Sequence, residues 1–178
     1  MLPSDLSGDV SMGLILETLP GAKRALFARY HLGGCQSCAF SNTETLAELC
    51  QRSELEVGEV LAYLLQSHQH DLEMWISPKE LKERLSSVCL VDVRSREEYE
   101  SVYIENSLLF TQELQQKLFA GSVDACYVLV DHQGKGVLDQ VAWFRGHGLK
   151  QTFGLLGGID GWSREIDPSL PRYRLEME

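Results

Sequence analysis

The sequence predicts two domains: a small all-α domain over residues 1–66, and an α/β domain over residues 75–178 built on a parallel sheet with helices on both faces. Two observations support this fold class. Up to Gln66 apolar residues recur at helical spacing, whereas beyond Trp75 short, continuous apolar runs alternate with amphipathic stretches. The polar stretch between the domains, residues 67–74, has no such periodicity and is interpreted as a linker.

In the N-terminal domain, apolar stripes at helical spacing run through residues 46–50 and 55–65 and are interpreted as core faces. An earlier helix is expected to begin near Pro20, because proline is favoured in the first turn. Gly33-Gly34 provides a flexible end for it. These patterns predict that the first domain is helical throughout.

The second domain alternates predicted strands and helices. The apolar runs predict strands over residues 89–93, 107–110, 126–130 and 152–156, and the amphipathic stretches predict helices over residues 79–85, 111–119 and 137–145. Parallel sheets of this kind bind ligands beyond the carboxyl ends of their strands. The turn that follows Val130 is therefore the first place to look for a site.

That turn is a six-residue loop, Asp131-His132-Gln133-Gly134-Lys135-Gly136. A tight strand–loop–helix connection with two glycines directs several backbone N–H groups to one point, which makes a cradle for an anion. The group at the base of this cradle is a carboxylate, and His132 is a candidate ligand contact. Asp131 could also serve simply as the N-cap of the following helix.

Residues 75–171 resemble the rhodanese family. The residues that carry the resemblance are Asp92-Val93-Arg94, Glu98-Tyr99, the six-residue loop, Leu156-Gly157-Gly158-Ile159-Asp160-Gly161-Trp162, Pro168 and Pro171. In that family the loop begins with a cysteine that accepts a sulfane sulfur, in a pattern similar to Cys-Arg-x-Gly-x-Arg. The resemblance implies a rhodanese-like fold and places Asp131 at the position of this cysteine.

Other departures from the family pattern are Gly136, at the last basic position of the loop, and Val102-Tyr103-Ile104, where the family has Gly-His-Ile. Gly134 is kept. A carboxylate cannot hold a transferable sulfur as a thiolate does, so we expect no catalytic residue in this loop and no thiosulfate sulfurtransferase activity. Cys126 lies five residues back along a strand, about 16 Å away at about 3.3 Å per residue, and does not replace the missing cysteine.

Cys35 and Cys38 form a Cys-x-x-Cys pair. The pair just precedes Ser41 and Glu44, whose capping-box spacing predicts a helix start. It could be a reversible dithiol/disulfide, half of a metal or iron–sulfur site, or two unreactive cysteines. A four-ligand metal site would need a second pair, which a homodimer could supply.

Residues 10–66 resemble a small helical domain best known from proteins associated with hybrid-cluster proteins, where it is described as a disulfide domain. The matching features are Leu14, Leu16, Leu19 and Pro20, then Tyr30-x-x-Gly33, the cysteine pair, Glu44-Thr45-Leu46 and the final leucine-rich helix. This resemblance implies a redox role for Cys35 and Cys38. Cys50, Cys89 and Cys126 lie in apolar stretches and are expected to be core residues.

The composition excludes several classes of function. The net charge of −10 argues against nucleic-acid binding, and no apolar run reaches the ~20 residues of a membrane span. The first residues resemble no secretory signal, so a cytoplasmic location is expected. We expect no cofactor.

Three functions remain open. The first is a thiol-redox or sulfur-relay protein that uses Cys35 and Cys38 with a thiol-redox or sulfur-carrying protein partner, while the second domain binds that partner or a ligand. The second is a non-enzymatic interaction module. The third is iron–sulfur or metal binding by Cys35 and Cys38 pairs across a dimer.

Overall fold

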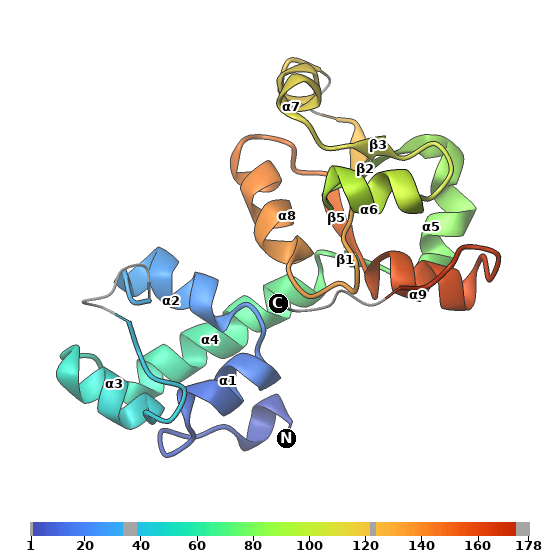
Figure 1. Ribbon diagram of the computed structural model, residues 1–178. Coiled ribbons are helices and arrows are strands. Elements are labelled where there is room, and N and C mark those ends of the chain that lie inside the picture. The colour runs from blue at the N-terminus through green and yellow to red at the C-terminus, as the bar shows by residue number, and fades with distance from the viewer. Residues whose placement is uncertain (1, 34–38, 122–123, 174–178) are drawn as a thin grey trace. The chain divides into compact units, whose positions relative to one another are not determined.

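The computed structural model describes residues 2–33, 39–121 and 124–173 and divides into two compact units, Met1–Glu73 and Met74–Glu178 (Figure 1). Cys35 and Cys38 lie outside the described residues. The second unit holds a parallel sheet and the first holds helices, so the predicted fold class is confirmed. No described helix is both long enough and apolar enough to cross a membrane.

The sheet of the second unit has, in its described part, five parallel strands in the order β1-β5-β4-β2-β3. Their bounds are β1 Trp75–Ile76, β2 Val88–Asp92, β3 Leu108–Leu109, β4 Cys126–Val130 and β5 Thr152–Leu155. The two edge strands have two residues each, and β1 was not expected from the sequence. The central strands were expected because they are continuous apolar runs, as strands buried on both faces require.

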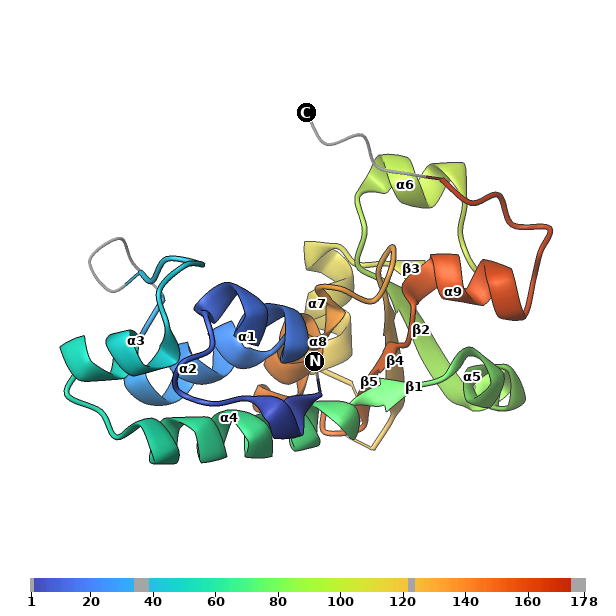
Figure 2. The ribbon, with the colours of Figure 1, turned by 90° about the horizontal axis from the view of Figure 1, so that it is seen from below.

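Helices cover both faces of this sheet (Figure 2). They are α5 Pro78–Arg84, α6 Arg96–Ser101, α7 Gln112–Phe119, α8 Val137–Gly146 and α9 Gly158–Glu165, with a short 3-10 helix at Leu85–Ser87. Side chains along β4 alternate between two cores: Val128 and Val130 pack with Trp162 of α9, whereas Tyr127 and Leu129 pack with Phe144 of α8. Successive strand residues point to opposite faces, which gives each face its own core.

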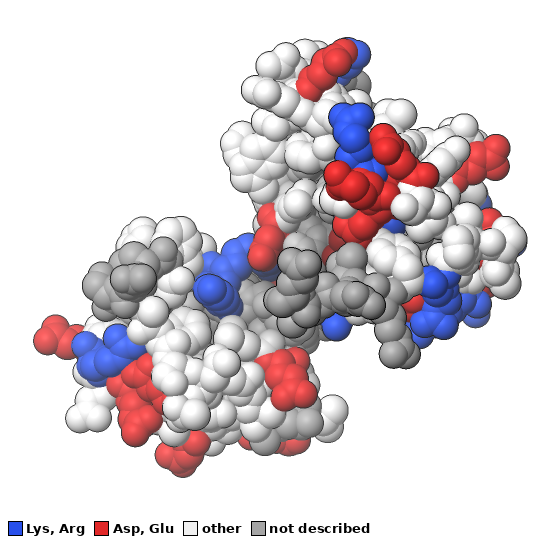
Figure 3. Space-filling model, viewed as in Figure 1, with Lys and Arg blue, Asp and Glu red and all other residues white. Residues whose placement is uncertain are grey.

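Local sequence explains where several of these helices begin. Ser77 and Glu80 form a capping box at α5, and Ser95 and Glu98 form another at α6, so that serine and glutamate satisfy the first free N–H groups reciprocally. Pro78 occupies the first turn of α5, where its missing N–H costs nothing. Acidic side chains gather over α6 (Figure 3), a helix whose first turn carries two glutamates.

The end of β2 is fixed by a buried ion pair. Asp92 and Arg94 have side chains 1% and 2% exposed, and the Arg94 Nη2 lies 2.6 Å from the Asp92 Oδ2. Arg94 Nε also donates to Asp92 at 2.9 Å, and Nη2 donates to the carbonyl oxygen of Val102 at 2.7 Å. Both charges are therefore satisfied inside the protein, and the chain after α6 is tied to the end of β2.

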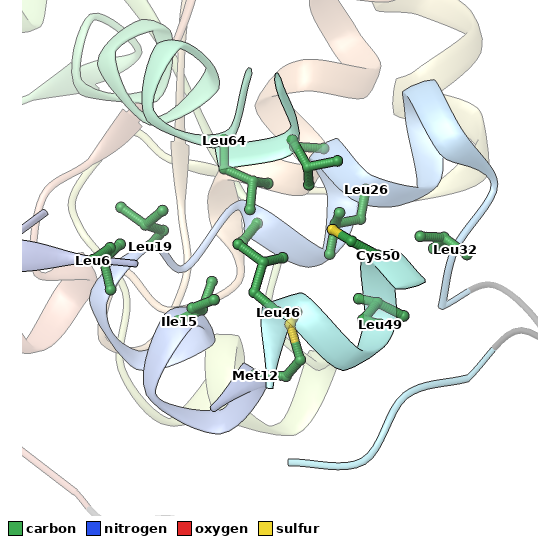
Figure 4. Close-up of a cluster of buried hydrophobic side chains, with 13 residues drawn as sticks. Leu6, Met12, Ile15, Leu19, Leu26, Leu32, Leu46, Leu49, Cys50 and Leu64 are labelled. Carbon is green, nitrogen blue, oxygen red and sulfur yellow. The ribbon is translucent and has the colours of Figure 1, made fainter. Parts of the chain in front are cut away.

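The first unit consists of a 3-10 helix, Pro3–Asp5, and four described α-helices: α1 Met12–Thr18, α2 Ala22–Tyr30, α3 Leu46–Arg52 and α4 Val57–Leu72. Their apolar faces meet in one cluster of buried residues, shown in Figure 4. Cys50 lies in this cluster and is 1% exposed, so its predicted place in the core is confirmed. A backbone bridge between Ser11 and Thr45 ties the start of α1 to that of α3.

Three boundaries in this unit differ from the sequence predictions. The earlier helix ends at Tyr30 because His31 itself takes the left-handed conformation, with φ of 57°, ahead of Gly33. The helix expected near Ser41 begins instead at Leu46, where Thr45 and Glu48 form the capping box.

The third difference concerns residues 67–74, expected to be a linker, because α4 continues through most of them to Leu72. Asp71 is buried at the end of this helix and pairs with Arg24 of α2. The last turns of α4 are thus held to α2 by an ion pair, although the sequence has no apolar stripe there.

The buried pair yields a prediction. Replacing Asp92 with alanine leaves the Arg94 guanidinium buried without its carboxylate, so we expect the free energy of unfolding, measured with urea, to fall by about 3–5 kcal/mol. The control is Glu113→Ala, which removes an exposed pair with Lys117 and should change stability little. Equal small effects from both variants would contradict the role given to the buried pair.

Candidate functional site

The loop that follows β4 closes around its own carboxylate. Asp131 Oδ1 accepts a hydrogen bond from the backbone N–H of Gly134 at 2.5 Å, and Oδ2 accepts one from the N–H of Gly136 at 3.1 Å. The N–H groups converge as expected for an anion cradle, and the anion they hold is the side chain of Asp131. Asp131 is not the N-cap of α8; Gly136 occupies that position.

The start of α9 forms the second wall of the loop. The N–H groups of Ile159 and Asp160 donate to the carbonyl oxygens of Asp131 and His132, at 2.9 and 3.1 Å. This approach needs glycine at Gly158, whose φ is +58° and where a Cβ would lie 2.5 Å from the Asp131 carbonyl oxygen. Because Gly158 has no side chain, the backbone at the start of α9 can lie directly against the backbone of the loop.

The residues just after Leu170 lie over the opening of the loop. The His132 ring stacks on the Tyr173 ring, with centroids 4.3 Å apart and planes 10° from parallel, and His132 Nε2 lies 3.0 Å from the Tyr173 carbonyl oxygen. The Tyr173 hydroxyl donates to Glu98 at 2.6 Å and accepts from Arg94 Nη1 at 2.8 Å. Arg94, one member of the buried pair at the end of β2, therefore also contacts the site through Tyr173.

These contacts shift the acidities of the groups involved. Burial, with the hydrogen bond to Glu98, raises the pKa of Tyr173 to about 12, against the opposing effect of Arg94. Burial alone would raise the pKa of Glu98, but hydrogen bonds from Tyr173 and Ser95 lower it overall. The hydrogen bond from Arg172 lowers the pKa of Asp160. The site therefore holds a neutral phenol between a carboxylate and a guanidinium at neutral pH.

An open cavity of about 380 Å³ adjoins the loop and is lined by Gln133, Asp160, Arg172 and Tyr173. Of the loop residues predicted to bind a ligand, Gln133 reaches this cavity, His132 is covered by Tyr173, and Lys135 is exposed. Sequence reasoning missed Arg172 and Tyr173, which lie beyond the region of resemblance. No local pattern marks them, because their roles depend on partners at Asp160, Glu98 and His132.

A family model for the rhodanese-like domain matches residues 77–165, half of the chain. The chain belongs to this family. The matched residues run from α5 through α9 and so include the loop and the glycines that pack against it, Gly157 and Gly158.

Solved structures similar to this domain include a rhodanese-related protein from Thermoplasma volcanium, with 25% identity over 56% of this chain and 98% of that chain, and a TM-score of 0.47. A rhodanese-like domain protein from Staphylococcus aureus is 26% identical over 56% of this chain and 97% of its own, with a TM-score of 0.44. The human single-domain sulfurtransferase is 22% identical over 52% and 96%, with a TM-score of 0.44. No curated protein matches the chain.

Within the rhodanese-like unit, the described cysteines Cys89 and Cys126 lie away from the loop. Cys89 and Cys126 lie near the amino ends of β2 and β4, whereas the loop follows the carboxyl end of β4. Both are half-buried, so their prediction as core residues holds only in part, and Cys126 Sγ accepts from Arg84 at 3.6 Å. Burial raises the pKa of Cys89 and, with a smaller effect of Glu56, that of Cys50.

Metal-ligating side chains do not cluster in the part of the chain that the structure describes: no three His, Cys, Asp or Glu residues there could hold one ion. The predicted redox residues, Cys35 and Cys38, fall outside that part.

The close approach of Gly158 to the loop yields a second prediction. Gly158→Ala adds a methyl group that meets the loop backbone and also strains the left-handed conformation, so we expect the free energy of unfolding to fall by about 3 kcal/mol. Gly148→Ala is the matched control, because φ there is also positive, +100°, but nothing lies within 4 Å of an added Cβ. Its strain alone should cost about 1 kcal/mol. Equal losses in urea unfolding would refute a close approach at Gly158.

Proposed function

We propose that this protein is a thiol-redox or sulfur-relay protein in which Cys35 and Cys38 carry the chemistry. In this proposal the rhodanese-like domain has no sulfur transfer of its own and binds a partner or ligand. The observation that carries the proposal is the loop of this domain, where the Asp131 carboxylate accepts hydrogen bonds from the N–H groups of Gly134 and Gly136.

Sulfur transfer at the loop would need a nucleophile that accepts a sulfane sulfur and releases it again. We infer that Asp131 stands where the family has its cysteine, and a carboxylate oxygen forms no persulfide. The same carboxylate uses two of the N–H groups that would stabilise a bound anion. It also repels anionic donors such as thiosulfate. Binding, rather than transfer, is what this loop can support.

The described cysteines are poorly suited to take over this chemistry. The thiolate is the reactive form of cysteine, and burial raises the pKa of both Cys50 and Cys89, which lowers their thiolate fraction. Cys126 lies at the amino end of β4, the far end from the loop. Thiol chemistry is therefore assigned to the Cys-x-x-Cys pair, on the strength of its sequence.

The relay can be written as a balanced exchange. One thiolate of the pair attacks a disulfide of the partner and forms a mixed disulfide, and the second thiolate displaces the partner sulfur. Cys35 and Cys38 are oxidised to a disulfide, and the partner is reduced to a dithiol. In the sulfur-carrying variant, one thiolate accepts a sulfane sulfur from a persulfide partner, which leaves as its thiolate.

Thiol counting and intact mass on freshly purified protein test this function. We expect the oxidised chain to lack two hydrogen atoms, that is two protons and two electrons, relative to the reduced chain, or to carry one added sulfur atom. Either change should disappear in Cys35→Ser and Cys38→Ser and persist in Cys126→Ser, the matched control. Two thiols that neither oxidise nor react with an alkylating agent in the folded protein would exclude the relay. A partner that stays bound when both are serine would favour a non-enzymatic interaction module.

A second experiment isolates the loop in a chain that carries Cys35→Ser and Cys38→Ser. We expect no thiosulfate:cyanide activity from this background. Adding Asp131→Cys restores a thiolate beneath the N–H groups, so incubation with thiosulfate should add one sulfur to the protein and release sulfite. Asp131→Ala is the control and should gain no sulfur. Clear turnover by the background chain that survives Asp131→Ala would refute the proposed inactivity of the rhodanese-like domain.

A further inference from the structure

The segment Pro171–Tyr173, called here the C-terminal segment, is held by three separate kinds of contact. Arg172 makes a two-point contact with Asp160, from Nε to Oδ1 at 2.6 Å and from Nη2 to Oδ2 at 3.1 Å. The phenol of Tyr173 lies between Arg94 and Glu98. The backbone carbonyl of Tyr173 meets His132 Nε2. The guanidinium contacts Asp160, the phenol contacts Arg94 and Glu98, and the backbone carbonyl contacts His132.

The partners of this segment are held in place by other parts of the domain. Arg94 is bound to Asp92 and Val102, and Glu98 accepts from the N–H of Ser95 in the capping box of α6. His132 belongs to the loop that the start of α9 holds by backbone hydrogen bonds. Because these residues are fixed by the rest of the domain, we expect them to keep their geometry when the segment leaves and to form a preformed groove.

The C-terminal segment follows a fixed residue, Leu170, and can leave the groove while Leu170 stays in place. Its last anchor to the domain upstream is Leu170, whose carbonyl oxygen accepts from the Ser163 hydroxyl at 2.7 Å and whose N–H donates to Asp167 at 3.1 Å. Beyond that point Pro171 and Arg172 are exposed, and the Arg172 side chain is 54% exposed. Of the three residues of the segment, Tyr173 alone packs against the apolar core, and a segment with so little buried surface can open locally.

We propose that the groove formed by Arg94, Glu98, His132 and Asp160 is a peptide-binding site for an extended Arg-Tyr sequence, and that the C-terminal segment occupies it in cis. A partner protein with an extended Arg-Tyr sequence binds the groove by displacing the C-terminal segment. This inference deepens the binding role proposed for the rhodanese-like domain and rests on it. The acidic surface over α6 (Figure 3) favours a basic occupant over an acidic one.

Competition in cis sets the scale of the expected effect. A short tether gives the segment an effective concentration of about 1 mM, so cis occupation of about 90% or more requires a Kd of about 0.1 mM or tighter for the same sequence in trans. A free peptide must then compete with the segment in the natural chain. Vacating the groove should strengthen trans binding by at least about tenfold.

The test uses the full chain and a fluorescent peptide of residues 167–173, Asp-Pro-Ser-Leu-Pro-Arg-Tyr, with an amidated end. Binding is followed by fluorescence anisotropy. The chain with Arg172→Ala and Tyr173→Ala together should bind the peptide at least about tenfold more tightly than the natural chain does. Arg96→Ala, which removes an exposed arginine that pairs with Glu100, is the control and should behave as the natural chain.

Two further arms separate recognition from nonspecific binding. A peptide ending in Ala-Ala should not bind the vacated chain, and Asp160→Asn in the vacated chain should weaken binding of the natural peptide about tenfold, with thermal unfolding as a check of its fold. No binding by a folded vacated chain, binding equal to that of the natural chain, or equal binding of the Ala-Ala peptide would overturn the inference. Thiol counts of Cys35 and Cys38 in the same samples test the relay separately.

Discussion

The arrangement of the site depends on one interaction, the pair of hydrogen bonds between the Asp131 carboxylate and the backbone of its own loop. An anion cradle normally draws an external ligand because convergent N–H groups leave positive potential unsatisfied. Here a covalently attached anion satisfies it. The loop is closed on its own carboxylate, and backbone hydrogen bonds from the start of α9 to Asp131 and His132 hold it in place.

The buried Arg94 connects that loop region to the fold. One guanidinium bonds Asp92 at the end of β2, the carbonyl of Val102 after α6, and the hydroxyl of Tyr173. Arg94 therefore contributes both to the stability of the domain and to the proposed peptide-binding groove. Removal of the Asp92 carboxylate would disturb the phenol as well as the strand, because the charge-assisted hydrogen bonds of a buried arginine are coupled.

Much of the second unit could be predicted from sequence because its signals are local. β2, β4 and β5 are continuous apolar runs, and α7 and α8 are amphipathic stretches between them. The two-residue strand β1 has no such signal, since its pairing with β5 is decided by tertiary contact. The roles of Arg172 and Tyr173 could not be predicted for the same reason. No local sequence pattern marks them, and their partners lie 12 to 79 residues away in the sequence. In the first unit, Asp71 extends α4 through a pair with Arg24 that no periodicity could reveal.

The chemistry of the loop has a consequence for durability. A thiolate held by N–H groups is the form of cysteine that peroxides and electrophiles attack first, and its over-oxidised acids are largely irreversible. Residues 131–136 contain no sulfur. Carboxylate, imidazole and amide groups keep their form in oxidants that convert a reactive thiolate, so the surface around Asp131 presents the same shape and charge in reducing and in oxidising surroundings.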